Sequence, residues 1–275
     1  MQMSIRRQIG DALPSGAKKH LLNAIFRAYG GLTRTRRPYE YLFILAHERS
    51  GSSLLAMLLG NNPEICGYGE TTVNYRSPSD LQLLAGNNLY RLQPFSMPGN
   101  ERYMMDKLVY EEHLAVEDFP MLLETNPKVI FLIREPVGTL RSMMPSMNLN
   151  DTFAAVFYIR RLEILQEYAH QIGAGVNALL LTYEDLIIRT TETLNGLTAF
   201  LDLQVPLLTE YEVLQPMKGR TAEHHKKLHI GRVDGRVPAS PQVTISERNL
   251  QVTQDAYDRC WTALSEVCES AVSPD

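Results

Sequence analysis

The stretch YLFILAHERSGSSLLAMLLG, residues 41–60, decides the fold. Its first six residues are apolar or aromatic, as in a buried strand, and its last nine have the composition of a helix that begins at Ser52. Gly51 allows a tight turn between them, and the first backbone N–H groups of the helix would face an anion. The alternative is an ordinary serine-rich N-cap. We expect a strand, a loop that binds an anion, and a helix.

The same alternation continues along the chain. Apolar runs that predict strands lie at 102–106, 128–133 and 177–183. Helical patterns occupy 77–86, 136–147, 151–173, 183–203 and 245–270. Strands that alternate with helices indicate an α/β protein with a central parallel sheet flanked by helices, whose ligands bind beyond the carboxyl ends of the strands.

The 275-residue chain has room for one substantial core, which we place at residues 38–275 as a single domain. Within it, residues 216–243 are basic, contain several Gly and Pro residues, and show no regular spacing of apolar residues, so we expect a long loop. Residues 1–37 carry eight Lys/Arg and one Asp, a charge of about +7. We expect this basic leader to be helical. It could lie on an anionic membrane or a partner, or be a solvated helix packed on the domain.

Composition and charge exclude several classes of protein. The formal net charge of −4 gives no argument for nucleic-acid binding. No stretch has the ~20 apolar residues needed to span a bilayer, and charges recur through residues 6–37, where a signal peptide would be apolar. Three cysteines do not make a disulfide framework. We therefore expect a reduced, cytoplasmic protein.

The loop at 46–53 departs from the triphosphate-binding pattern GxxxxGK[ST] at the lysine, whose position is taken by Ser52. Arg49 is the nearest cation that could replace the lysine. A short loop with one Arg and several hydroxyls suits a single phosphate better than a Mg²⁺-bound triphosphate.

A second motif follows the strand predicted at 128–133. Arg134 directly follows this strand, Pro136 suits the first turn of a helix, and Ser142 lies eight residues after Arg134. Arg134 and Ser142 can then converge on a second anion. The alternative is an Arg–carboxylate pair beside a serine on a helix surface.

Together, RSGSSLL (49–55) and RxPxxxxxS (134–142) resemble the paired motifs of sulfotransferases that use 3′-phosphoadenosine-5′-phosphosulfate, or PAPS. The resemblance runs from about 41 to 203 and is greatest to the carbohydrate and protein-tyrosine branch. It extends to NNPEICGYGET (61–71), MMDKLVY (104–110) and LTYEDL (181–186). It implies a P-loop NTPase-like three-layer fold, adenosine 3′,5′-bisphosphate as the product of the donor, and no metal.

The resemblance also implies roles for individual residues. The 5′-phosphosulfate would be held by Arg49, Ser50, Gly51, Ser52 and Ser53. The 3′-phosphate would be held by Arg134 and Ser142, with Tyr183 in the adenosine pocket. The family's donor-covering loop is matched loosely by KKLHIGRVDGR (226–236), with Lys227, Arg232 and Arg236 as candidates. Glu48 stands where many members have Pro, and the sequence offers no physical reason for an acid there.

Sulfuryl transfer needs a base for the acceptor hydroxyl and a cation for the leaving oxygen. Glu70 is our candidate base, because the matching acid in related sulfotransferases has this role, whereas a helix-start glutamate is the structural alternative. His47 and His113 are alternative bases. Lys107 is the candidate for the leaving oxygen, and the alternative for it is a surface pair with Asp106.

The acceptor is less defined. Residues 71–86 should form one wall of its cleft, where Tyr75 offers a stacking face and Arg76 a cation. The acceptor would be a hydroxyl of a glycan, a glycolipid or a small molecule. Two other functions stay open: a P-loop kinase-like phosphotransferase, and a nucleotide-binding protein without catalytic activity.

Overall fold

The computed structural model describes residues 15–36, 39–92, 99, 101–173, 177–214, 231–233 and 242–272. In these residues the chain forms a six-stranded sheet in the order β2-β3-β1-β4-β5-β6, and all neighbouring strands are parallel. The strands are β1 (Glu40–Ala46), β2 (Ile65–Cys66), β3 (Tyr103–Leu108), β4 (Lys128–Ile133), β5 (Asn177–Thr182) and β6 (Glu269–Ser270). The predicted parallel sheet is confirmed.

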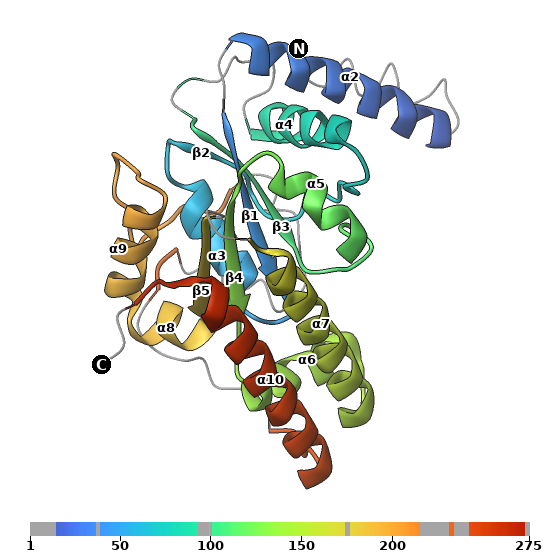
Figure 1. The fold of residues 1–275 in the computed structure, drawn as a ribbon, viewed down its shortest axis with the longest axis vertical. Helices are drawn as coiled ribbons and strands as arrows, with labels where there is room; N and C mark the ends of the chain where they lie inside the picture. Colours follow the sequence, from blue (N-terminus) through green and yellow to red (C-terminus); the bar gives the residue numbers. More distant parts are fainter. Residues whose placement is uncertain are drawn as a thin grey trace.

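Helices cover both faces of this sheet (Figure 1). They are α2 (Ser15–Arg36), α3 (Ser52–Gly60), α4 (Pro78–Leu92), α5 (Phe119–Leu123), α6 (Pro136–Met147), α7 (Asp151–Gln171), α8 (Tyr183–Ile188), α9 (Thr190–Phe200) and α10 (Glu247–Val267), with a 3₁₀ turn at Val116–Asp118. Alternate residues of β1, β3, β4 and β5 enter two apolar clusters, one against α3, α8 and α9 and the other against α4, α6, α7 and α10. The result is a three-layer α/β fold.

The position of β1 determines where a ligand can bind. β1 lies between β3 and β4, and the register pairs Leu45 with Leu108 and Ala46 with Leu132. The loops that leave these three strands therefore start side by side at one edge of the sheet. The chain places β2 and β3 on one side of β1 and then crosses to β4 on the other side, which makes β1 a topological switch point where α/β proteins bind ligands.

The basic leader contains the 22-residue helix α2, which lies across α4 at the end of the molecule opposite to α6, α7 and α10 (Figure 1). Two glycines allow the close crossing. A Cβ on Gly30 would lie 2.0 Å from the Gln82 carbonyl oxygen, and one on Gly86 would lie 1.9 Å from the Phe26 carbonyl oxygen. None of the helices in the described part of the chain is long and apolar enough to cross a membrane.

Three details differ from the sequence prediction. The helix expected at 183–203 is divided at Arg189, where the backbone leaves the helical region (φ −106°, ψ 39°). Strands β2 and β6 have two residues each and were not predicted, because two residues give no periodicity. The C-terminal helix ends at Val267 instead of 270, and the chain then pairs with β5.

Candidate active site

The loop after β1 has the backbone geometry that Gly51 allows. Gly51 lies in the left-handed region (φ 89°) and is the N-cap of α3, with no side chain capping the helix. A Cβ at this position would lie 2.4 Å from Cδ2 of Tyr183, so the ring of Tyr183 packs directly on the glycine. Ser50 is buried, and its Oγ has no hydrogen-bond partner among the described residues. The N-terminus of α3 and this hydroxyl fit an anion.

Two arginines meet beside this loop. Nη1 of Arg134 donates to the Arg49 carbonyl oxygen at 3.2 Å, and Nε of Arg49 donates to Oγ of Ser142 at 2.9 Å. The guanidinium of Arg134 also lies over the Tyr183 ring, 4.1 Å from its centroid. The sequence separates these residues by up to 134 positions, and the structure brings all four together. Arg49, assigned from the sequence to the 5′-phosphosulfate, contacts the residue assigned to the 3′-phosphate.

These guanidinium groups are placed to receive an anion. Burial lowers the pKa of Arg49, and the charge of Arg134 lowers it further. Among the described residues neither arginine has a carboxylate within ion-pair distance, and the buried Nε of Arg134 has no acceptor. Two like charges held together in a buried site are costly unless an anion lies between or beside them. The alternative of an Arg134–carboxylate pair is therefore wrong within the described part of the chain.

The capped N-terminus of helix α6 positions Arg134. The side chain of Glu135 is its N-cap and accepts from the backbone N–H of Val137 at 3.0 Å and of Gly138 at 2.6 Å. Pro136 occupies the first turn, as predicted. A Cβ on Gly138 would lie 2.7 Å from Nη2 of Arg134, so glycine leaves room for the guanidinium. The sequence pattern that could have shown this arrangement is Glu-Pro-x-Gly at 135–138, which follows Arg134 at the end of β4.

His47 joins the two loops and does not act as a base. It is fully buried; its Nε2 accepts from the Arg134 N–H at 2.9 Å, and its Nδ1 donates to the Glu48 carbonyl oxygen at 2.8 Å. Burial lowers the pKa of His47 to about 3, so the ring is neutral. Both nitrogens are occupied, which removes His47 from the candidate bases.

Lys107 lies between Glu70 and the anion loop. Its Nζ is 2.8 Å from Oε1 of Glu70 and donates to Oγ of Ser53 at 3.0 Å. The Lys107 side chain is 4% exposed and that of Glu70 is 18% exposed, so the pair is shielded from solvent. The alternative for Lys107, a surface pair with Asp106, is not found among the described residues, since adjacent residues of a strand point to opposite faces of the sheet.

Asp106 instead holds the segment that carries Glu70. Its buried carboxylate accepts from the N–H of Thr71 (3.0 Å), the hydroxyl of Thr71 (2.6 Å), the hydroxyl of Tyr75 (2.7 Å) and the N–H of Lys107 (2.9 Å). Burial raises the pKa of Asp106 to about 6, although these hydrogen bonds oppose the shift. The four bonds fix Glu70 next to Lys107, a positioning role that the sequence did not reveal.

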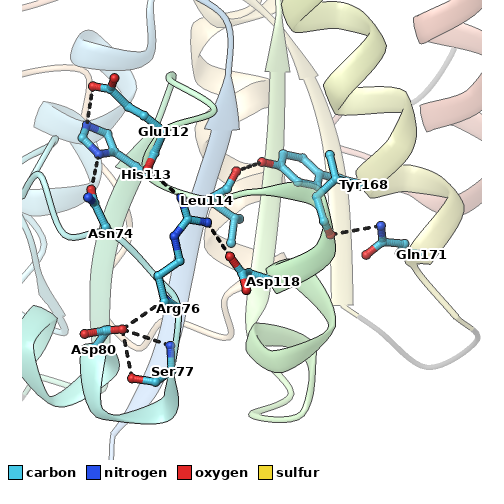
Figure 2. Close-up of polar contacts among 11 residues, drawn as sticks. Asn74, Arg76, Ser77, Asp80, Glu112, His113, Leu114, Asp118, Tyr168 and Gln171 are labelled. Atoms are coloured by element: carbon cyan, nitrogen blue, oxygen red, sulfur yellow. Dashed lines mark hydrogen bonds and ion pairs between the residues drawn. The ribbon is translucent and has the colours of Figure 1, made fainter.

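The predicted acceptor wall needs correction at Tyr75 and Arg76. Tyr75 is fully buried, and its hydroxyl is bonded to Asp106, so its ring has no face to offer a ligand. Arg76 is partly exposed, but its guanidinium is bonded to the Asp118 carboxylate and the Glu112 carbonyl oxygen (Figure 2). Both residues stabilise the fold between β3 and α4.

His113 belongs to the same structural network. Figure 2 shows its ring between Asn74 and Glu112; the Nδ1–Oδ1 distance to Asn74 is 2.9 Å and the Nε2–Oε1 distance to Glu112 is 4.0 Å. The backbone carbonyl of His113 accepts from the Tyr75 N–H at 2.8 Å. These contacts join the chain before α4 to the chain after β3, and they leave Glu70 as the better-placed base.

The donor-covering candidates have different outcomes. Lys227 and Arg236 lie outside the described residues. Arg232 is described, and it forms an antiparallel bridge with Glu210. This bridge lies beside the C-terminal end of α3, where Asn61 bonds to the backbone of Glu212. It is about 13 Å along the helix from the anion loop, so the backbone at Arg232 lies away from Arg49 and Arg134.

Glu48, for which the sequence offered no physical reason, lies among charged groups. Glu48 is half-buried, and burial raises its pKa; the charge of Glu70 raises it too, while Arg161 and Lys107 oppose the shift. Arg161 is buried and donates from Nε to the Ala46 carbonyl oxygen (2.9 Å) and from Nη2 to the Leu108 carbonyl oxygen (2.8 Å). It joins the ends of β1 and β3 beneath the site and supplies a positive charge near Glu48.

A pocket of about 420 Å³ opens next to the segment that follows Glu70. It lies between α2, α4 and residues Thr71–Asn74. Its charged lining residues are Lys19, Arg27, Asp80 and Arg91. Arg27 and Asp80 are paired at 2.7 Å, which leaves an excess of positive charge on the walls.

Comparison with known proteins agrees with this fold and identifies the family. A family model described as a sulfotransferase domain matches residues 40–237, which is most of the chain, so the chain belongs to the sulfotransferase family. It is therefore an enzyme of sulfuryl transfer, the class that the two sequence motifs predicted. A comparison with curated proteins gives no match.

Two solved structures share the fold. The sulfotransferase domain from the curacin biosynthetic pathway is 18% identical over 81% of this chain and 98% of its own, with a TM-score of 0.50. The sulfotransferase domain from the Synechococcus PCC 7002 olefin synthase is 17% identical over 80% of this chain and 95% of its own, with a TM-score of 0.55. At these identities the likeness concerns the fold alone.

Proposed function

We propose that the chain transfers a sulfuryl group from PAPS to the hydroxyl of an acceptor that is a glycan, a glycolipid or a small molecule. The observation that carries this proposal is the pair Arg49 and Arg134: the Arg134 guanidinium bonds to the backbone of Arg49 and its charge lowers the Arg49 pKa, while neither side chain has a carboxylate partner in the described residues. A second anion site beside the loop suits a donor with phosphates at both the 3′ and 5′ positions. A P-loop kinase-like activity would leave this pair without a role.

The donor would use two groups of residues. Arg134, Ser142 and Arg49 would bind the 3′-phosphate, since Arg49 contacts both Ser142 and Arg134. The turn at Ser50–Ser53 and the N-terminus of α3 would bind the 5′-phosphosulfate. Tyr183 would pack against the adenosine, because its ring borders both Gly51 and Arg134. The unbonded hydroxyl of Ser50 and the unbonded Nε of Arg134 are buried polar atoms that such a donor would satisfy.

The transfer itself would depend on Glu70 and Lys107. Glu70 would take the proton of the acceptor hydroxyl as its oxygen forms the bond to sulfur, in line with the bond that breaks to the 5′-phosphate oxygen. Lys107 would neutralise the negative charge that develops on this leaving oxygen. Its contact with Ser53 places its ammonium group at the loop, and its contact with Glu70 keeps the base beside it.

The acceptor would approach from the side of Thr71–Asn74. The pocket next to this segment has an excess of positive charge from Lys19 and Arg91, which favours an acceptor that carries an anionic group near its hydroxyl. Tyr75 and Arg76 would take no part in binding this acceptor, since both are engaged in structural contacts.

Substitution of the base tests this function. With ³⁵S-labelled PAPS and a panel of hydroxyl compounds, the chain should label an acceptor, and Glu70→Gln should reduce labelling at least roughly 100-fold, the usual range for a general base. Affinity for adenosine 3′,5′-bisphosphate should stay within about twofold, since Gln keeps the size of the side chain. Full labelling by Glu70→Gln would remove Glu70 from the mechanism, and no labelling by the unmodified chain of any panel compound while bisphosphate binds would favour a non-catalytic nucleotide-binding protein.

A further inference from the structure

The outer face of helix α2 is apolar and exposed. Six exposed residues on this face are apolar, namely Ala17, Leu21, Ala24, Ile25, Ala28 and Leu32, and the exposed His20 lies at the edge of the face. Leu21 is 41% exposed, Ile25 42% and Leu32 48%. Their spacing of three, four and seven residues places them in one stripe, which extends about 22 Å along the helix. We call these six residues the α2 stripe.

The opposite face of α2 packs against α4 and the core, so the α2 stripe must face outward. Gly30 is buried against the backbone of Gln82, and Thr33 is fully buried. Phe26 packs on the core cluster, and its carbonyl oxygen meets Gly86 of α4. The helix therefore cannot turn its apolar stripe inward without losing its contact with α4.

The charge of α2 indicates what kind of surface covers the stripe. The 22 residues contain five cations (Lys18, Lys19, Arg27, Arg34 and Arg36) and no acid, a charge of +5. The whole chain is −4, so the remainder is −9. A second copy placed stripe to stripe would bring two +5 helices together, which is repulsive. An anionic lipid surface attracts this helix and repels the rest of the molecule.

We propose that α2 binds the surface of an anionic lipid bilayer, with the α2 stripe in the interface and the helix axis parallel to the membrane. The net positive charge of α2 would attract the anionic headgroups, although Arg27 is already paired with Asp80 and contributes least. The inner face of the same helix lines the pocket at Thr71–Asn74, so the membrane would lie on the far side of α2 from this pocket. This interaction does not depend on the proposed transfer reaction.

Vesicle co-sedimentation of the 275-residue chain tests the proposal. The chain should pellet with vesicles of phosphatidylcholine and phosphatidylserine, pellet less with pure phosphatidylcholine, and dissociate as the salt concentration rises. The double substitution Leu21→Gln and Ile25→Gln should lower the partition coefficient at least about tenfold, since it removes two large apolar side chains from the interface. The far-UV circular dichroism spectrum and the thermal midpoint of this variant should be unchanged, which shows that it is folded.

A matched control uses two apolar residues that are even more exposed but lie elsewhere. Ile188 (62% exposed) and Leu208 (67% exposed) changed to Gln should leave vesicle binding unchanged. The proposal is overturned if the chain does not pellet with anionic vesicles, or if the α2 variant pellets as well as the unmodified chain. It is also overturned if the chain is a dimer that the α2 substitutions convert to a monomer, because a second copy would then cover the stripe.

Discussion

Arg134 is the residue on which the choice of donor depends. Its guanidinium contacts the carbonyl of Arg49, lies over the ring of Tyr183 and keeps a buried Nε without a partner. A charge-assisted hydrogen bond to a phosphate contributes roughly 1.5–3 kcal/mol, so one such residue can decide between ligands with and without a 3′-phosphate.

We expect Arg134→Ala to weaken binding of adenosine 3′,5′-bisphosphate roughly 10- to 100-fold, because it removes the charged fork from the 3′-phosphate. Binding of 5′-AMP should change by no more than about twofold, since 5′-AMP has no 3′-phosphate to lose a contact. Isothermal titration calorimetry measures both affinities. Arg160→Ala, which removes an exposed arginine paired with Glu111, is the control. Equal weakening of the two nucleotides would place Arg134 outside a 3′-phosphate site.

The sequence predicted the location of those site residues that lie close to a strand end. Gly51, Arg134 and Ser142 each lie at a fixed distance from a strand end, so the spacing alone brings them toward one site. Tyr75 was misplaced because its burial depends on Asp106, a residue 31 positions away. The charged surroundings of Glu48 could not be predicted either, because they include Arg161, which is distant in sequence and reaches the strand ends from α7.

At the scale of elements, His47 holds the ends of β1 and β4 together, and this has a consequence for pH. Burial lowers the pKa of His47 to about 3, whereas an unfolded chain has a histidine pKa near 6.5. Between these values the unfolded chain binds a proton that the folded protein does not, so the free energy of unfolding rises with pH across this window. Asp106, with its pKa raised to about 6 by burial, contributes with the opposite sign between about pH 4 and 6.

Replacing His47 isolates its contribution from that of Asp106. The free energy of unfolding of the unmodified protein should increase between pH 5 and 7 by roughly 2 kcal/mol more than that of His47→Gln. Urea denaturation at the two pH values measures this difference. His170→Gln, at an exposed histidine near the end of α7, should keep the pH dependence of the unmodified protein. Identical pH profiles for His47→Gln and the unmodified protein would contradict a neutral, buried His47.

The crossing of α2 and α4 gives a second prediction at this scale. Gly86→Ala would place a Cβ 1.9 Å from the Phe26 carbonyl oxygen, a backbone atom that cannot rotate away. We expect a loss of roughly 1–3 kcal/mol in the free energy of unfolding and faster proteolysis within α2. Gly173→Ala is the matched control, because a Cβ there meets nothing within 4 Å. If the two alanine variants unfold and digest alike, α2 does not pack on α4 as described.

Elements with a strong pattern were predicted and short ones were missed. The four long strands are buried and apolar, and helices with clear periodicity connect them. The division at Arg189 is stabilised by a hydrogen bond across the break, in which the hydroxyl of Thr193 donates to the Asp185 carbonyl oxygen at 3.0 Å. Propensity along 183–203 does not contain this information, since each side of the break is helical by itself.

At the scale of the whole molecule, the architecture assembles the site from distant segments. The parallel order places the ends of β1, β3 and β4 side by side, so loops that are far apart in sequence share one edge of the sheet. This is why the two anion motifs, more than 80 residues apart, could be assigned to one ligand from sequence. The position of α2 could not be predicted in this way, because its glycine crossing with α4 has no local signature.

Calorimetry of the unmodified protein tests whether the chain binds a donor nucleotide with a 3′-phosphate. Adenosine 3′,5′-bisphosphate, ADP and ATP–Mg²⁺ would be titrated under the same conditions. We predict that the bisphosphate binds at least about tenfold more tightly than ADP, because only the bisphosphate can engage Arg134 and Ser142 through its 3′-phosphate. Binding of ATP–Mg²⁺ without binding of the bisphosphate would contradict the account.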